Sequence, residues 1–167
     1  MIDRKTLSKA ATFGDIAVVR AALVEGCDLN ARNVIGKTLL MSAAASGHTE
    51  IVRLLLDSGA DPNIPDDIGM TPLLMATQRQ SHDAVTMLLQ HGARVDACDP
   101  AGNTPLHKAV LHCVAPEDEA MVWELVSSGA DPHARNKSGV KPVALAQAIA
   151  GNRVAETLGK YERPMFG

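Results

Sequence analysis

Histidine and cysteine are the residue types in this 167-residue chain that could carry metal or nucleophilic chemistry. His82 and His91 lie nine positions apart, so they do not form the i, i+4 pair with which one face of a helix binds zinc. Cys113 directly follows His112, but a nucleophile and its base must converge in space, which adjacency in the sequence does not provide. The chain also has no G-x-S-x-G, H-E-x-x-H, P-loop or G-x-G-x-x-G motif. We therefore expect a protein that is not an enzyme, with no catalytic residues, no metal and no cofactor.

The composition excludes several classes of partner. The net charge of −3 provides no basic face for nucleic acid. There is no run of about 18 apolar residues that would predict a membrane span, and no apolar stretch near the first residues that would indicate a secretory signal. The cysteines are odd in number and widely spaced, which favours reduced thiols over disulfides or a zinc framework: Cys27, Cys98 and Cys113. We expect a cytoplasmic protein.

Composition and glycine spacing predict the helices and repeats that position the side chains of this chain. Aromatic residues make up only 2% of the chain, so the core must consist of Leu, Val, Ile, Ala and Met, which favours closely packed helices. Two series of glycines recur every 33 residues, and each has a fourth member 37 residues later: Gly36, Gly69, Gly102 and Gly139, and Gly26, Gly59, Gly92 and Gly129. A fixed period of this length indicates an array of stacked structural repeats.

Each 33-residue unit has the local chemistry of two helices and a turn. Thr71-Pro72 and Thr104-Pro105 place a hydroxyl at a helix N-cap and proline at the first helical position. An alanine-rich first helix follows, and a more apolar second helix, such as residues 51–56, ends at a glycine suited to the left-handed conformation. The link to the next unit carries Asp or Asn and another glycine, as in residues 66–69, which predicts a projecting hairpin-like turn.

These motifs resemble the ankyrin repeat. Its 33-residue period and T-P-L-H-x-A signature occur whole at residues 104–109, closely at 71–76 and in part at 38–43, within a resemblance that covers about residues 3–161. The resemblance implies an all-α ankyrin-repeat solenoid of about five helix-turn-helix units with β-hairpin-like connecting loops. It also implies that His48 and His107 hydrogen-bond to backbone or to a nearby hydroxyl group and do not bind a metal.

We expect residues 1–162 to form one ankyrin-repeat domain, followed by a tail at 163–167. Its parts would be an N-terminal cap at 3–32, repeats at 33–65, 66–98 and 99–135, and a C-terminal cap at 136–162. The repeat at 99–135 is longer than the others, and its extra residues fall around 113–119. Two interpretations stay open: a longer loop before a helix that begins near Pro116, or an acidic protrusion that touches a partner. Trp123 either packs under this loop or marks a second interface.

The resemblance places partner binding on the hairpin tips and on the concave face of the first helices. Apolar side chains fall there at positions where water is expected: Phe13, Val34, Ile35, Ile68, Met70 and Leu111. Single exposed apolar residues are common, and hairpin packing could bury some of these, but a row along one groove favours an interface. Arg79 is the best polar anchor, since arginine is enriched at hot spots. The candidate partner-binding set is Phe13, Val34, Ile35, Lys37, Asp67, Ile68, Met70, Gln78, Arg79, Asn103, Leu111 and His112.

The functional prediction is a non-catalytic, monomeric module that binds a partner protein of unknown identity through the hairpin tips and the concave face. The alternative is an inhibitor or immunity protein that blocks an enzyme or a toxin. A third hypothesis, an enzymatic or metal-dependent role, predicts metal in the purified protein. Neither nucleic acid nor a membrane is expected as a partner.

Overall fold

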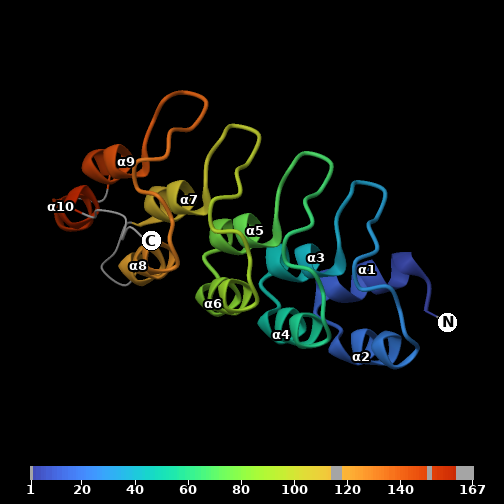
Figure 1. The fold of residues 1–167 in the computed structure, drawn as a ribbon. Coiled ribbons are helices and arrows are strands. Elements are labelled where there is room, and N and C mark those ends of the chain that lie inside the picture. The colour runs from blue at the N-terminus through green and yellow to red at the C-terminus, as the bar shows by residue number, and fades with distance from the viewer. Residues whose placement is uncertain (1, 114–117, 150–151, 161–167) are drawn as a thin grey trace, which may run out of the picture. The chain divides into compact units, whose positions relative to one another are not determined.

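The computed structural model describes residues 2–113, 118–149 and 152–160, and these residues form ten α-helices and no β-strand (Figure 1). The all-α class expected from the sequence is confirmed. Residues 114–117 of the predicted insertion and the predicted tail at 163–167 lie outside the described residues. In chain order the helices are α1 (Arg4–Phe13), α2 (Ile16–Val24), α3 (Leu39–Ser46), α4 (Thr49–Asp57), α5 (Pro72–Gln78), α6 (His82–Gln90), α7 (Pro105–His112), α8 (Glu119–Ser127), α9 (Pro142–Ile149) and α10 (Asn152–Lys160).

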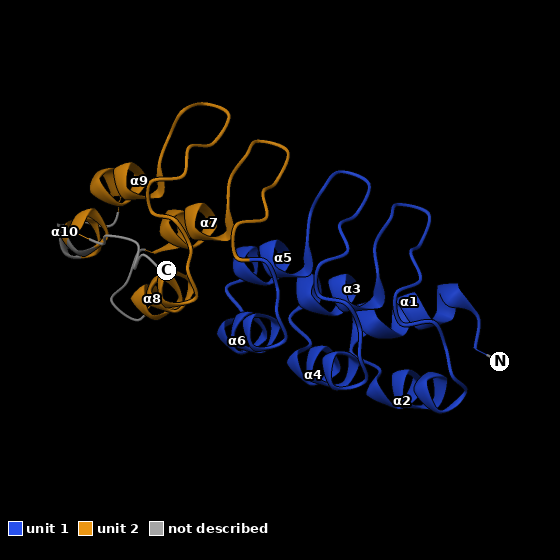
Figure 2. Cartoon of the chain, in the orientation of Figure 1, with its two compact units in different colours: residues 1–94 blue, residues 95–167 orange. Residues whose placement is uncertain are grey.

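The helices belong to two compact units, unit 1 at residues 1–94 and unit 2 at residues 95–167 (Figure 2). Within unit 1, α1 packs on α3 and α3 on α5, while α2, α4 and α6 form a second layer against them. Within unit 2, α7 packs against α8 and α9, and α9 packs against α10. The predicted pairing of successive helices is confirmed. The single domain at 1–162 and its internal boundaries stay a prediction.

Threonine side chains begin the first helix of three successive pairs. The hydroxyl groups of Thr38, Thr71 and Thr104 each accept a hydrogen bond from the backbone N–H three residues later, at 3.3, 3.3 and 3.4 Å. Proline is the first residue of α5, α7 and α9, where its missing N–H leaves no helical hydrogen bond unmade. These helix starts agree with the sequence prediction, because N-capping depends on residues that are neighbours in the chain.

Four hairpin-like loops project from the helix pairs, at residues 33–37, 66–70, 99–103 and 136–140 (Figure 1). In each loop the backbone N–H of the first residue donates to the carbonyl oxygen of the fifth, at 2.9 to 3.0 Å. The Oδ1 atom of the first residue also accepts hydrogen bonds from the N–H groups of the third and fifth residues. These first residues are Asn33, Asp66, Asp99 and Asn136. A single side chain thus fixes the shape of each loop.

The two histidines of the repeat motif have structural roles, as the resemblance implied. His107 is fully buried. Its Nδ1 lies 2.9 Å from the Thr104 hydroxyl and its Nε2 lies 3.0 Å from the Val140 carbonyl oxygen. Burial lowers the pKa of His107, so the ring is neutral at pH 7. His48 places its Nε2 2.9 Å from the Thr12 carbonyl oxygen, which links two helix pairs of unit 1.

Candidate functional site

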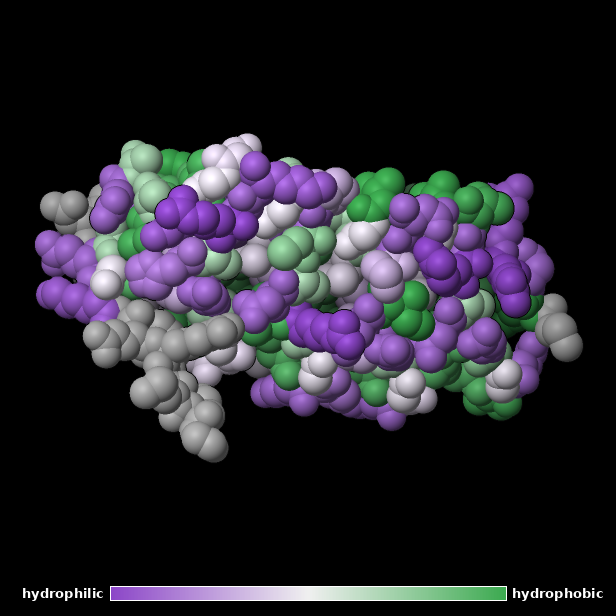
Figure 3. Space-filling view, turned by 45° about the horizontal axis from the view of Figure 1, so that its top comes forward, coloured by the Kyte–Doolittle hydropathy of each residue, from purple (hydrophilic) through white to green (hydrophobic). Residues whose placement is uncertain are grey.

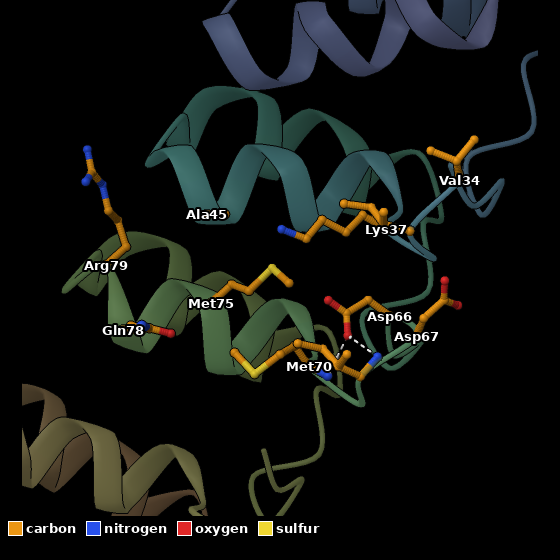
Figure 4. Close-up of a pocket in the computed structure, with 11 residues that line it drawn as sticks. Val34, Lys37, Ala45, Asp66, Asp67, Met70, Met75, Gln78 and Arg79 are labelled. Atoms are coloured by element: carbon orange, nitrogen blue, oxygen red, sulfur yellow. Dashed lines mark hydrogen bonds between the residues drawn. The ribbon is translucent and has the colours of Figure 1, made fainter. Parts of the chain in front are cut away.

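A groove of about 820 Å³ lies on unit 1, between the loops at 33–37 and 66–70 and the helices α3 and α5 (Figure 4). We call it the unit 1 groove. It brings together eight of the twelve residues that the sequence singled out, and each is now a proposed contact: Val34, Ile35, Lys37, Asp67, Ile68, Met70, Gln78 and Arg79. Its other lining residues are Ala45, Asp66 and Met75.

An ion pair links the two loops that border the groove. The guanidinium of Arg32 donates to Oδ1 of Asp67 at 2.7 Å, and its Nε donates to the Gly36 carbonyl oxygen at 2.9 Å. Both charged side chains are half-exposed, so solvent screens the pair and its contribution to stability is small. Its role is geometric, because one side chain contacts both loops and sets their spacing.

The rim of the unit 1 groove is apolar where it meets water. Val34 is 99% exposed, Ile68 is 66% exposed and Ile35 is 54% exposed. Figure 3 shows hydrophobic surface along the projecting loops of unit 1, interrupted by polar side chains. Met70 differs from this expectation, because it is half-buried in the groove. Three large apolar side chains exposed along two adjacent loops are typical of a surface that another molecule covers.

Two basic side chains line the groove without an ion-pair partner among the described residues. Lys37 is half-buried, Arg79 is exposed at the end of α5, and neither forms an ion pair with a described carboxylate. Gln78 is exposed beside Arg79. These groups are available to a partner, and arginine in particular is enriched among residues that dominate binding free energy.

Asp66 is a buried carboxylate in the wall of the groove, with 6% of its surface exposed. Its Oδ1 accepts hydrogen bonds from the backbone N–H groups of Ile68 and Met70, at 3.1 and 2.9 Å. Figure 4 shows the other carboxylate oxygen turned away from the loop backbone, toward Met75. No described residue donates a hydrogen bond to this second oxygen.

Asp66 and Met75 are groove residues that the sequence reasoning missed. The sequence indicates only a turn at Asp66, which accounts for Oδ1 but not for the second oxygen. Met75 precedes Gln78 and Arg79 by three and four residues, so helical spacing places all three on one side of α5. This spacing was the available signal for Met75.

The other four predicted contacts lie outside the unit 1 groove. Phe13, the last residue of α1, is 78% exposed on unit 1. Leu111 and His112 are exposed at the end of α7 in unit 2. Asn103 is half-buried there, and its Oδ1 accepts from Nδ2 of Asn136 at 2.8 Å. Asn103 therefore joins two loops of unit 2, which is a structural task that the sequence did not reveal.

The predicted insertion is described only at its ends. Cys113 is buried, and α8 is described from Glu119 onward. Trp123 is half-buried on α8. Residues 114–117 lie outside the described residues, so the loop and the acidic protrusion both stay predictions.

The described cysteines and histidines do not form a reactive centre. Burial raises the pKa of Cys27, Cys98 and Cys113, and neighbouring carboxylates raise it further, so the thiols are protonated and poor nucleophiles. Among the described residues, no three His, Cys, Asp or Glu side chains lie close enough to hold a metal ion. Within the same residues, no helix has the length and apolar character needed to cross a membrane.

Comparison with known proteins identifies the repeat. A family model described as ankyrin repeats, three copies, matches residues 3–66 and residues 58–136. No curated protein matches the chain. The two matched ranges include all residues of the unit 1 groove and most of the described helices.

Proposed function

The chain belongs to the ankyrin-repeat family, and from that premise we propose that it is a non-catalytic module that binds a partner protein through the unit 1 groove. Repeats of this family are generally protein-protein interaction modules. The observation that carries the proposal for this surface is the exposure of Val34, Ile35 and Ile68 along one hollow of about 820 Å³. Covering apolar surface of this kind is the main favourable contribution to protein association.

Preorganised loops support the same proposal. Asn33 and Asp66 hold their loops closed, and the Arg32–Asp67 pair joins one loop to the other. Loops already held in one conformation lose little conformational entropy when a partner binds. The groove therefore offers apolar contact together with a low ordering cost.

The test compares partner capture by the wild-type chain and by two variants. In the groove variant, Ile35→Ser and Ile68→Ser remove two of the three apolar side chains of the rim but keep the loops, because Ser138 occupies the same place in the loop at 136–140. In the control variant, Val24→Ser removes an apolar side chain that is 89% exposed at the end of α2, outside the groove. Each variant and the wild-type chain are used as bait in a cell extract, and captured proteins are identified by mass spectrometry.

We expect a partner that the wild-type chain and the control capture and the groove variant does not. Full burial of an isoleucine side chain stabilises a complex by about 1.5–3 kcal/mol, so each replacement weakens binding about tenfold or more. Capture of the same proteins in the same yield by all three baits would contradict the proposal.

Two further properties belong to the proposal. A cytoplasmic location is supported by three cysteines that are all free. A monomeric state predicts a mass near 17.6 kDa by light scattering. No feature of the groove favours an enzyme or a toxin over another class of partner, so the inhibitor alternative stays a prediction, which co-expression with a captured enzyme would test.

A further inference from the structure

A comparison between two loops of the chain indicates what the groove lacks. Asp66 opens the loop at 66–70 in unit 1, and Asp99 opens the loop at 99–103 in unit 2. Both aspartates are buried, at 6% and 8% exposure, and both use Oδ1 to accept two backbone N–H groups of their own loop. The two carboxylates therefore occupy equivalent local settings, and they differ in what meets Oδ2.

In unit 2 the second oxygen of Asp99 has two donors. The ammonium Nζ of Lys108 lies 2.7 Å from Oδ2, and Nδ2 of Asn103 donates to it at 3.2 Å. The Lys108 side chain is only 16% exposed and that of Asp99 only 6%. A charged donor on a shielded carboxylate forms a strong hydrogen bond. This loop geometry thus accommodates an ammonium group at Oδ2.

In unit 1 methionines replace both donors. A shift of 33 residues places Met70 at the position of Asn103 and Met75 at the position of Lys108. A thioether side chain donates no hydrogen bond, so Oδ2 of Asp66 has no donor from its own loop or from the first turn of α5. Both methionines line the unit 1 groove instead. Among the described residues no buried side-chain oxygen or nitrogen lacks a hydrogen-bond partner, so Oδ2 of Asp66 is in contact with the solvent of the groove. A cation from another molecule can replace this solvent and form a charge-assisted hydrogen bond with Oδ2.

We infer that Asp66 binds the charged end of a lysine or arginine side chain of the partner protein, whose methylene stem lies along Met70 and Met75. The inference rests on the proposed function and names the chemistry that the partner must present. Methionine is flexible and polarisable, so it adapts to a long aliphatic stem. Lysine and arginine bury such stems against apolar surface while the charged end meets a polar group. The partner thus presents a basic residue next to an apolar one, and the apolar one contacts Ile35 or Ile68.

Other charged groups of the groove could pair with Asp66 or with the incoming cation. The carboxylate of Asp67 is already bound by Arg32 at 2.7 Å. Lys37 lines the same groove but forms no ion pair with Asp66, and its positive charge opposes the arrival of another cation. Arg79 lies at the far end of α5. Asp66 is therefore the one groove carboxylate among the described residues that has no cationic partner.

Residues at equivalent positions in the other loops indicate which substitutions should keep the fold. Asp66→Asn keeps the loop closed, because Asn33 and Asn136 make the same two Oδ1 hydrogen bonds. Met75→Lys fills the site from within, as Lys108 does for Asp99. Glu50→Gln is the control, since it removes the same charge from an exposed carboxylate in the first turn of α4, outside the groove.

The probe is a random peptide library displayed on phage and selected against the full-length chain. We expect selected peptides to contain Lys or Arg beside a large apolar residue. The affinity of the synthetic consensus peptide should fall about tenfold or more on Asp66→Asn, because the charge-assisted hydrogen bond to the peptide is lost. It should fall by a similar factor on Met75→Lys, because the new lysine already occupies the Asp66 carboxylate. On Glu50→Gln the affinity should change less than about threefold.

Three outcomes separate this inference from the proposed function. Peptides that depend on Ile35 and Ile68, but bind Asp66→Asn as well as the wild type, would overturn the role of Asp66 and leave the groove intact. Peptides without a basic residue would do the same. A selection whose binders are all indifferent to Ile35→Ser, Ile68→Ser, or that yields no binder, would contradict both proposals.

Discussion

The four residues that open the loops perform one structural task with two different side chains. Asn33, Asp66, Asp99 and Asn136 all close their loops through Oδ1. The second polar atom of each side chain is what differs. It is an amide nitrogen in two loops, an oxygen bound by Lys108 in a third, and an oxygen that faces a groove in the fourth. On the inference made above, the residue that meets this second atom determines whether the loop only packs within the chain or also binds a partner.

The ion pair between Asp99 and Lys108 should stabilise the fold in a pH-dependent way. Burial raises the pKa of Asp99, but the hydrogen bonds from Lys108 and Asn103 outweigh burial, so the pKa in the folded protein lies below its ordinary value of 3.8. A carboxylate with a lowered pKa stabilises the folded state above its ordinary value, and the contribution disappears as the pH falls through the folded value. We expect Lys108→Met to lower the free energy of unfolding by about 2–4 kcal/mol at pH 7.

Urea denaturation at pH 7 and at successively lower pH checks this prediction. The difference between the wild type and Lys108→Met should shrink as the pH approaches and passes below 3.8. Lys37→Met is the control, since Lys37 is half-buried but has no ion pair, and it should change stability by less than about 0.5 kcal/mol. Equal losses in the two variants, or a difference that does not vary with pH, would contradict the assigned role of Lys108.

At the scale of elements, the groove depends on how closely two loops of unit 1 approach. Gly36 and Gly69 occupy the same position in successive loops, with φ of 75° and 87°. A side chain at Gly36 would meet the backbone N–H and carboxylate of Asp67 and the guanidinium of Arg32, whereas a side chain at Gly69 would meet open space. One glycine therefore permits a close approach, and the other serves only its own turn.

This difference predicts unequal effects for the same substitution. Gly69→Ala should cost about 1 kcal/mol, the penalty for a left-handed residue that has a Cβ atom. Gly36→Ala should cost about 2–4 kcal/mol, because displacement of the neighbouring loop is added to that penalty. Thermal or chemical denaturation of the two variants measures the contrast. Similar stabilities would show that the two loops adjust to each other without resistance.

Local chemistry explains which elements could be predicted from the sequence. Thr71 and Thr104 begin helices because the bonds they make reach only three residues along the chain, so sequence spacing was sufficient. The groove was predicted less completely, since its composition depends on which faces of α3 and α5 turn toward the loops. Met75 was missed for this reason. The sequence predicts a surface contact at Asn103 and does not reveal its bond to Asn136, because this bond joins loops 33 residues apart.

At the scale of the whole molecule, the predicted binding surface divides between the two compact units. The sequence predicts one row of contacts through successive repeats. Eight of the twelve predicted residues line a single groove of unit 1. Leu111 and His112 are exposed in unit 2, and Phe13 is exposed elsewhere on unit 1. Sequence periodicity identified equivalent positions in each repeat, but equivalence does not require that every repeat take part in binding.

The most direct test of binding through the unit 1 groove is an NMR titration of the full-length chain, labelled at isoleucine and methionine methyl groups, with the captured partner. We expect the largest changes in chemical shift or intensity at Ile35, Ile68, Met70 and Met75, which line the groove. The methyl groups of Ile16 on α2 and of Met121 on α8 should change little. Binding that leaves Ile35 and Ile68 unchanged and perturbs methyl groups outside the groove would contradict the proposed function.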